Sequence, residues 1–312
     1  MAFWLVTGGL GFIGSHLAQA LTRRGDRVRI VDDLSTGRRE HAPPGAEVVI
    51  GDVVDPAVVA EAMAGVDGCF HLAAIASVQR CTEDWAASHR VNLGATVNLF
   101  EAARRATTGS GRAVPVVYAS SAAVYGDNPD QPLTEQAATR PLSAYGADKL
   151  GCELHGRVAA RVHGVPNTGF RFFNVYGPRQ DPKSPYSGVI AIFADRLGAG
   201  QPITIFGDGG QVRDFVFVDD VVAHLLAGMA APASTAEVYN VCTGRPTSVA
   251  DLARIIGEIL GVEPEIQSAA PRPGDIRTSI GNPAAAASAF GLEAEIEIRD
   301  GLARTLAWTR RS

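Results

Sequence analysis

Lysine is nearly absent from this sequence of 312 residues. Only Lys149 and Lys183 occur among 28 lysine and arginine residues, and these basic residues face 33 acidic ones. The formal net charge of −5 leaves no basic stripe to neutralise the phosphates of a nucleic acid, so nucleic-acid binding is not expected. Because arginine is the usual cation of this chain, a lysine favours the interpretation that a compact ammonium with rotatable donors is needed at its position.

Cysteine pairs and long apolar runs are missing as well. Cys69, Cys81, Cys152 and Cys242 are scattered without any Cys-x-x-Cys, so we expect buried thiols of a reducing compartment, no disulfide framework and no metal site. No apolar run approaches the roughly 18 residues of a membrane span. The first apolar run begins at residue 3, which leaves no room for a signal peptide. These absences predict a cytoplasmic protein that does not bind membranes.

Tyr145 and Lys149 form the most suggestive pair that the sequence contains. They stand in the run Ser143-Ala144-Tyr145-Gly146-Ala147-Asp148-Lys149. A gap of three residues places both side chains on one face of a helix. There the ammonium would favour the ionised form of the phenol, which a base at neutral pH requires. Tyr-x-x-x-Lys alone is common by chance, so the interpretation depends on the rest of the chain.

The N-terminus carries a glycine-rich loop of the kind that binds dinucleotides. Residues 3–7 are apolar and partly β-branched, which predicts a buried strand. Gly8, Gly11 and Gly14 follow, and residues 15–21 have helical periodicity. The pattern Gly-x-x-Gly-x-x-Gly predicts a tight turn, a close approach of the backbone to a pyrophosphate, and a helix start that faces the anion.

A second expected strand, residues 27–31, ends in Asp32 and Asp33. Asp32 lies 18 residues beyond the last glycine of the loop, close to the usual distance for a carboxylate that binds an adenosine ribose diol. An acid at this position favours NAD over NADP, because a 2′-phosphate would meet a like charge. Arg38 and Arg39 follow and could weaken that preference.

Strands and helices alternate through about residue 175, which predicts an α/β fold with a Rossmann-type doubly wound parallel sheet. Further strands are expected over 47–53, 68–74, 114–119 and 169–175. Asp52 and Val53 would close the third strand near an adenine, and the small Ala73 and Ala74 would close the fourth near the cofactor.

Two long helices are expected, over 92–105 and 145–162. The first carries Leu93, Val97 and Phe100 on one stripe, and the second carries Leu150, Leu154 and Val158. We expect these stripes to pack on the sheet and the other faces of the helices to be available to a second subunit.

The regular alternation of expected strands and helices ends after residue 176. A proline-rich loop covers 177–186, Ser248 is expected to open a helix that Gly261 ends, and an alanine run at 284–287 suggests another helix. We therefore expect an NAD-binding domain over 1–175 with a returning segment near 215–242. Residues 176–214 and 243–312 would form a smaller, discontinuous C-terminal lobe that binds the substrate over the sheet's carboxyl edge.

Several ordered motifs together resemble the extended short-chain dehydrogenase/reductase family, in its UDP-hexose 4-epimerase branch, over essentially the whole chain. They are the glycine loop 8–14, Asp32-Asp33-Leu34-Ser35, Ser120-Ser121-Ala122-Ala123-Val124-Tyr125-Gly126, the Tyr145 and Lys149 pair, Arg171-Phe172-Phe173-Asn174-Val175-Tyr176-Gly177, Gly207-Asp208-Gly209 with Arg213-Asp214-Phe215, and Arg272-Pro273-Gly274-Asp275.

The resemblance implies an NAD-dependent epimerisation at C4 of a UDP-hexose. Tyr145 would be the base, Lys149 would support it and bind the nicotinamide ribose, and Ser121 would donate to the reacting oxygen. We assign the NAD contacts to Gly8, Gly11, Phe12, Ile13, Gly14, Asp32, Asp33, Asp52, Val53, Leu72, Ala73, Ala74, Asn92, Ser120, Tyr145 and Lys149. The resemblance also implies a homodimer.

Substrate contacts are expected from Ser121, Asn174, Arg213, Arg272, Asp275 and Ser279. An arginine fork suits a diphosphate and a carboxylate suits a ribose diol. Arg213, within Val212-Arg213-Asp214, could instead form a surface ion pair. Ser279 stands where the family places a residue that bounds the sugar pocket, and a small residue there resembles enzymes that admit an N-acetyl group. We therefore expect UDP-GlcNAc and UDP-GalNAc as substrates, with UDP-Glc and UDP-Gal.

Four alternatives remain open. Related dehydratases and decarboxylases place acids beside the active-site hydroxyl, whereas Ala122 and Ala123 follow Ser121 here. A UDP-glucuronate 4-epimerase would need a cation for the C6 carboxylate, which Lys183 or Arg277 could supply. The remaining two are an oxidoreductase that releases its reduced cofactor and a nucleotide sensor without catalysis.

Overall fold

The computed structural model describes residues 1–109, 111–181, 188–232, 234–271 and 276–310. The chain forms two compact units. The first comprises Met1–Val124, Ser143–Arg171 and Val222–Tyr239, and the second comprises Tyr125–Leu142, Phe172–Val221 and Asn240–Ser312. Residues 125–142, which the sequence analysis placed in the NAD-binding domain, thus group with the second unit. The segment that returns to the first unit is correspondingly shorter than the expected 215–242.

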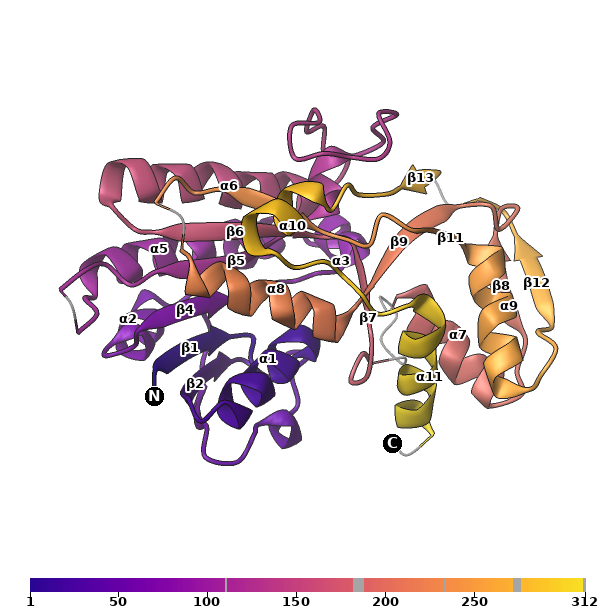
Figure 1. Ribbon diagram of the computed structural model, residues 1–312, viewed down its shortest axis with the longest axis horizontal. Coiled ribbons are helices and arrows are strands. Elements are labelled where there is room, and N and C mark those ends of the chain that lie inside the picture. The colour runs from indigo at the N-terminus through magenta and orange to yellow at the C-terminus, as the bar shows by residue number, and fades with distance from the viewer. Residues whose placement is uncertain (110, 182–187, 233, 272–275, 311–312) are drawn as a thin grey trace. The chain divides into compact units, whose positions relative to one another are not determined.

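A seven-stranded parallel sheet runs through the fold in the order β10-β6-β5-β4-β1-β2-β3 (Figure 1). Its strands are β1 (Phe3–Thr7), β2 (Arg27–Asp32), β3 (Glu47–Ile50), β4 (Gly68–His71), β5 (Val116–Ser121), β6 (Asn167–Phe172) and β10 (Val238–Val241). The strand order reverses between β1 and β4, which is the signature of a doubly wound sheet. The expected fold class is therefore confirmed.

Two strands end earlier than the sequence suggested. β3 stops at Ile50, because the carboxylate of Asp52 turns back to accept the Val54 N–H at 2.9 Å and so ends the ladder. β4 stops at His71, which leaves Ala73 and Ala74 in the following loop. The expected strand 169–175 is divided at Phe173 into β6 and β7 (Asn174–Tyr176).

Helices cover both faces of the sheet. α2 (Pro56–Met63), α5 (Ala95–Arg105) and α6 (Ala144–His163) share one hydrophobic cluster with alternate residues of the strands, including Leu5, Cys69 and Val116. On the opposite face of β6, Gly228 of α8 (Val218–Ala230) lies against Phe170. The remaining helical elements of the unit are α1 (Phe12–Arg23), the 3-10 turns Arg39–His41 and Ala122–Tyr125, α3 (Val78–Glu83), α4 (Trp85–His89) and the π-turn Arg90–Gly94.

The expectation that the stripes on α5 and α6 pack on the sheet is wrong in part. Phe100 is buried, but Val97, Leu154 and Val158 are 37%, 52% and 45% exposed. The helix periodicity identified residues that share a face, and that face is turned largely to the surface. The sheet-facing residues of α5 and α6 include the buried Leu99, Ala103, Cys152 and Ala159.

Among its described residues, the second unit contains smaller sheets and four complete helices. β9 (Val212–Phe217) pairs with β7, β11 (Pro246–Ser248) and β13 (Thr278–Ser279), and β8 (Ile203–Phe206) pairs with β12 (Ile266–Ala269). Its helices include α7 (Val189–Gly198), α9 (Val249–Leu260), α10 (Ala284–Phe290) and α11 (Ile298–Thr309). Ser248 caps α9 and Gly261 ends it with a φ of 72°, as the sequence predicted.

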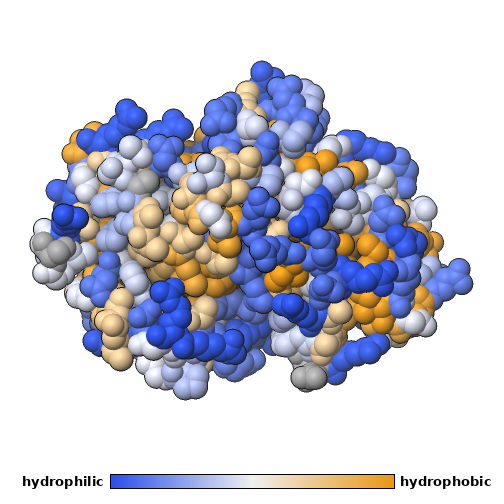
Figure 2. Space-filling model, in the orientation of Figure 1, coloured by the Kyte–Doolittle hydropathy of each residue, from blue (hydrophilic) through white to orange (hydrophobic). Residues whose placement is uncertain are grey.

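The surface in Figure 2 mixes hydrophilic and hydrophobic residues across the visible face. Among the described residues, no helix combines the length and the apolar composition that crossing a membrane requires.

A buried chain of hydrogen bonds joins β1 to helix α5 through His71 of β4. The Oγ1 of Thr7 accepts the N–H groups of Leu72 and Ala73 at 3.2 and 3.3 Å and lies 2.7 Å from Nδ1 of His71. The Thr7 hydroxyl proton is therefore donated to Nδ1. Nε2 then carries the imidazole proton and donates it to Oγ1 of Thr96 at 3.1 Å.

This arrangement requires a neutral imidazole. His71 is 4% exposed, and burial together with the charge of Lys149 lowers the pKa of His71 to about 3 from its usual 6.5. The unfolded chain therefore binds a proton between these pH values that the folded chain does not bind. The contribution of His71 to stability is complete above pH 6.5 and decreases as the pH falls toward 3.

His71→Asn should flatten the acid dependence of stability. The Asn side chain keeps an acceptor for Thr7 but does not titrate, so the variant should lose less stability than the parent below pH 6.5. The difference should be roughly 1.4 kcal/mol per pH unit. Urea unfolding at a series of pH values from 7 down to 4 measures it, with exposed His163→Asn as the control. Equal slopes for His71→Asn and the parent would contradict the neutral assignment.

Candidate active site

The glycine loop between β1 and α1 can hold an anion. Gly8 has a φ of 66°, and a Cβ at this position would lie 2.8 Å from the Ala73 nitrogen. A Cβ on Gly14 would collide with the Gly8 carbonyl oxygen. Gly11 is the N-cap of α1, with no side-chain cap and no acid in the first turn of the helix. The first N–H groups of α1, at Phe12 and Ile13, are therefore available to a pyrophosphate.

Asp32 supports this loop from the end of β2. It is 6% exposed, and its two oxygens accept the N–H groups of Leu10 and Leu34, both at 2.9 Å. Asp33 is exposed and accepts from the backbone and hydroxyl of Ser35 at 2.9 and 2.6 Å. A carboxylate has about four acceptor sites, so both acids retain capacity for a ribose. The contact between Asp32 and the glycine loop was not foreseen from the sequence.

The loop after β4 is fixed against Gly8 from two sides. Thr7 holds Leu72 and Ala73, as described above. Asn92 accepts the Ile75 N–H through Oδ1 at 2.8 Å and donates Nδ2 to the Ile75 carbonyl at 3.2 Å. The side chain of Asn92, expected at the cofactor, thus holds the loop after β4, and its contact with NAD stays a prediction. Leu72 and Ala73 of this loop lie against Gly8.

Tyr145 and Lys149 meet on the first turns of α6, which Ser143 caps through the Gly146 N–H at 3.1 Å. Nζ of Lys149 lies 5.8 Å from the centroid of the Tyr145 ring. It also donates to the carbonyl of Ala119 at 2.9 Å, which ties α6 to the last residues of β5. Lys149 is 4% exposed and Tyr145 is half-buried. The structure thus brings a buried ammonium beside a phenol that a ligand can still reach.

The two serines that end β5 have different roles. Oγ of Ser121 accepts the Ala123 N–H at 3.1 Å, which leaves the hydroxyl proton for donation to a ligand. Ser120 is 1% exposed and donates its hydroxyl to Oε1 of Glu153 at 2.6 Å. The side chain of Ser120, expected at the cofactor, is thus directed into the core. Of the other expected cofactor residues, Asp52 is exposed and Val53 is 5% exposed.

The second unit carries the expected substrate residues. Asn174 is exposed at the start of β7, and Arg213 is half-buried on β9 and donates Nη1 to the Val212 carbonyl at 2.9 Å. Ser279 stands opposite Arg213 in the pairing of β13 with β9. Two further expected residues, Arg272 and Asp275, lie outside the described residues, as does Lys183.

Asp214 is a structural acid rather than a surface partner of Arg213. It is fully buried and accepts from the Thr243 N–H and hydroxyl at 2.8 and 2.7 Å, from the Gly244 N–H at 2.8 Å and from the Gly281 N–H at 3.2 Å. Successive residues of a strand point to opposite faces, so Arg213 is directed away from this cluster. Burial raises the pKa of Asp214 despite these donors.

Potential metal ligands are not clustered in the part of the chain that the structure describes. No group of three or more His, Cys, Asp or Glu side chains there is placed to hold a metal ion. The four cysteines are free and buried, and burial raises the pKa of Cys69 and Cys242.

Comparison with known proteins agrees with this site. The NAD dependent epimerase/dehydratase family matches residues 4–242. A UDP-glucose 4-epimerase from Mycolicibacterium smegmatis is 39% identical, over 98% of each chain. The crystal structure of a UDP-glucose 4-epimerase from Thermotoga maritima with UDP-glucose is 35% identical, with a TM-score of 0.93 over 99% of both chains.

A UDP-N-acetylglucosamine 4-epimerase from Methanobrevibacter ruminantium M1, in complex with UDP-N-acetylmuramic acid, is 32% identical, with a TM-score of 0.93 over 99% of this chain and 98% of that one. The glycine loop, the acid after β2 and the tyrosine and lysine of α6 are thus found in a chain whose relatives share its fold throughout. The resemblance inferred from the motifs is confirmed: the chain belongs to the NAD-dependent epimerase/dehydratase family, and its cofactor is NAD.

Proposed function

We propose that the chain is an isomerase, an NAD-dependent 4-epimerase of UDP-hexoses that accepts UDP-GlcNAc and UDP-GalNAc together with UDP-Glc and UDP-Gal. The observation that carries the proposal is the buried ammonium of Lys149, 5.8 Å from the ring centroid of Tyr145. We further propose that the first unit binds NAD and that the second unit supplies contacts to the UDP-sugar, through Asn174, Arg213 and Ser279.

The chemistry follows from the acidity of the substrate. The hydrogen on a carbinol C4 is not acidic, so removal of a proton from carbon cannot invert that centre, whereas oxidation to a ketone and reduction from the other face can. Bound NAD would supply the hydride acceptor for the first step and the donor for the second. Tyr145 takes the proton of the 4-hydroxyl and later returns it, and Lys149 favours the ionised phenol. Ser121 donates to the same oxygen and polarises the transient carbonyl.

Neighbouring reactions of the family fit less well. Elimination of water from a sugar requires an acid or base beside the active-site hydroxyl. Ala122 and Ala123 follow Ser121, and Oγ of Ser121 is tied to the Ala123 N–H rather than to a carboxylate. This arrangement supports an epimerase over a dehydratase.

Ser279 and Arg277 bear on the choice of sugar. Ser279 is small, which suits a pocket that admits an N-acetyl group. The alternative substrate, UDP-glucuronate, needs a cation for its carboxylate. Arg277 donates Nη1 and Nη2 to the two oxygens of Asp208 at 2.6 and 3.0 Å, so its fork is already engaged. These observations favour neutral hexoses.

The purified protein should interconvert UDP-GlcNAc with UDP-GalNAc, and UDP-Glc with UDP-Gal, without added cofactor, as followed by proton NMR. Tyr145→Phe should lower kcat by about 10²-fold or more, because the base is lost while binding is kept. Stoichiometric release of NADH would favour an oxidoreductase, and a Tyr145→Phe variant with full biological output would favour a sensor. Turnover of UDP-glucuronate alone would refute the Ser279 argument.

Ser279→Tyr tests the pocket boundary separately. The phenol should exclude the N-acetyl group by steric overlap, so kcat/KM for UDP-GlcNAc should fall by about 10²-fold while UDP-Glc is turned over within a few-fold of the parent rate. Steady-state kinetics on both substrates measure the ratio. Ser279→Ala is the control and should change neither value appreciably. Equal losses on both sugars would show that residue 279 does not bound the N-acetyl site.

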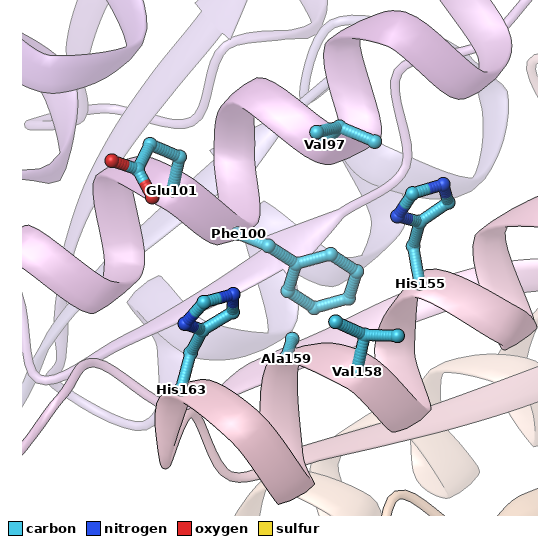
Figure 3. A pocket seen from close by; sticks show the side chains of 7 residues that line it. All are labelled: Val97, Phe100, Glu101, His155, Val158, Ala159 and His163. Atoms are coloured by element: carbon cyan, nitrogen blue, oxygen red, sulfur yellow. The ribbon is translucent and has the colours of Figure 1, made fainter.

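We also propose that the protein is a homodimer through α5 and α6. Val97, Leu154, Val158 and Val162 are exposed on these two helices, by 37%, 52%, 45% and 70%. Figure 3 shows a hollow between the helices into which Phe100 reaches from α5 toward Val158 and Ala159 of α6, with Val97, Glu101, His155 and His163 around it. Apolar residues grouped on adjacent helices are typical of a surface that meets a second copy.

Val158→Glu should convert the dimer into a monomer, because pairing would bury an unpartnered charge. Light scattering at micromolar concentration gives the mass directly. Val262→Glu is the matched control, since Val262 is 40% exposed but belongs to the second unit and should leave the mass unchanged. A parent protein that is monomeric at this concentration would refute the dimer.

A further inference from the structure

A fully buried ion pair lies behind the Tyr145 and Lys149 pair, within the same unit. Glu153 and Arg171 are 1% and 3% exposed. Nε of Arg171 donates to Oε1 of Glu153 at 2.8 Å, and Nη2 donates to Oε2 at 2.7 Å. Ser120 adds a third donor to Oε1 at 2.6 Å. Such a pair is an expensive way to stabilise a core, because apolar side chains of equal volume often serve as well. Stability alone therefore does not account for this ion pair.

The position of Glu153 on α6 suggests that reason. Tyr145, Lys149 and Glu153 follow one another at intervals of four residues, so they occupy one face of the helix on consecutive turns. Lys149 thus has a phenol one turn before it and a carboxylate one turn after it. A free carboxylate at 153 would attract the ammonium more strongly than the phenol does, and it would weaken the ability of Lys149 to keep Tyr145 ionised.

Arg171 removes this competition. Its fork engages both oxygens of Glu153 from β6, and Ser120 fills a further acceptor site from β5. The ion pair is close to neutral as a whole, so Lys149 experiences little of the charge of Glu153. The second carboxylate next to Lys149 is that of Asp148. Its Oδ1 accepts from Nδ1 of His89 at 2.7 Å, and its Oδ2 is buried without a hydrogen-bond partner in the described part of the chain.

The other titratable groups around Lys149 leave its charge uncompensated. His71 on β4 is neutral, as shown above, and burial raises the pKa of the Cys152 thiol on α6 and of the Tyr118 phenol on β5, so both stay uncharged. Apart from Oδ2 of Asp148, the titratable groups around Lys149 on β4, β5, α4 and α6 are therefore neutral or hydrogen-bonded. Arg157 of α6 is exposed.

We propose that Arg171 and Glu153 are positioning residues of the epimerisation. Arg171 withdraws the Glu153 carboxylate from Lys149, and the neutralised Glu153 anchors the end of β5 through Ser120, next to Ser121. The inference rests on the proposed function, because it assigns these residues to the ionisation of Tyr145. It extends the site by two residues that do not touch substrate or cofactor.

The test is the pH dependence of kcat in three variants. If the reaction requires an ionised phenol, kcat rises with pH. A change in the charge near Lys149 should shift the pH at which kcat rises, which is the rising limb of the pH profile. Arg171→Met leaves Glu153 free to compete for Lys149 and should move the limb to higher pH by about one unit. Glu153→Gln removes the negative charge of the pair and keeps that of the guanidinium, so it should move the limb to lower pH by a similar amount. Glu153→Gln with Arg171→Met removes both charges and should restore the parent limb.

Opposite displacements that cancel in the double variant cannot come from a merely structural defect, which would lower kcat in both single variants without moving the limb. Arg157→Met is the control for loss of an arginine from the unit and should leave the limb in place. Because removal of one member of a buried pair can prevent folding, Ser120→Ala is measured as well. It keeps the charges, and kcat should fall by about 3- to 10-fold with the limb unmoved and KM unchanged.

The inference would be overturned if kcat rises over the same pH range in the parent, in Glu153→Gln and in the double variant. This outcome can be read even if Arg171→Met does not fold. A Ser120→Ala variant with a displaced limb would also overturn it, since this change removes no charge. Parent protein that epimerises no UDP-sugar would instead refute the proposed function, so the two failures are distinguishable.

Discussion

The buried ammonium of Lys149 is the constraint on which the active site depends. A cation that is 4% exposed is costly unless its surroundings compensate it. The carbonyl of Ala119 offers one hydrogen bond at 2.9 Å, and the ring of Tyr145 lies on the other side. Because the remaining charge of Lys149 would be stabilised by an ionised phenol, its burial supports the proposed role of Tyr145 as the base. Lys149 therefore also links α6 to β5 through its hydrogen bond to Ala119.

In the part of the first unit that is proposed to bind NAD, hydrogen bonds from polar side chains hold the backbone of the loops. Asp32, Thr7 and Asn92 each fix a loop at the carboxyl end of β1 or β4, on either side of the point where the strand order reverses. Ligands of doubly wound sheets bind at this reversal. These hydrogen bonds position the loops beside the glycines, whose backbone the pyrophosphate is proposed to approach.

Much of this could be predicted from the sequence, and the exceptions share a cause. The fold class, the glycine loop, the Ser248 and Gly261 helix ends and the approach of Lys149 to Tyr145 follow from local pattern. The roles of Ser120 and Asn92 do not, because their partners Glu153 and Ile75 are 33 and 17 residues away. Likewise, periodicity placed Val97 and Val158 on one face but could not show whether that face meets the sheet or the surface.

The surroundings of Lys149 offer a physical reason why the chain uses lysine at this position although lysine is otherwise scarce. Arginines in the chain are found in forked pairs with carboxylates, such as Arg171 with Glu153 and Arg277 with Asp208. A guanidinium at position 149 would require a similar planar partner, and any carboxylate that satisfied it would neutralise the charge that Tyr145 needs. The ammonium of Lys149 donates to the Ala119 carbonyl, which carries no net charge, so its own charge is kept beside the phenol. The chain can therefore use arginine wherever charges are to cancel, but it needs lysine where a charge must remain.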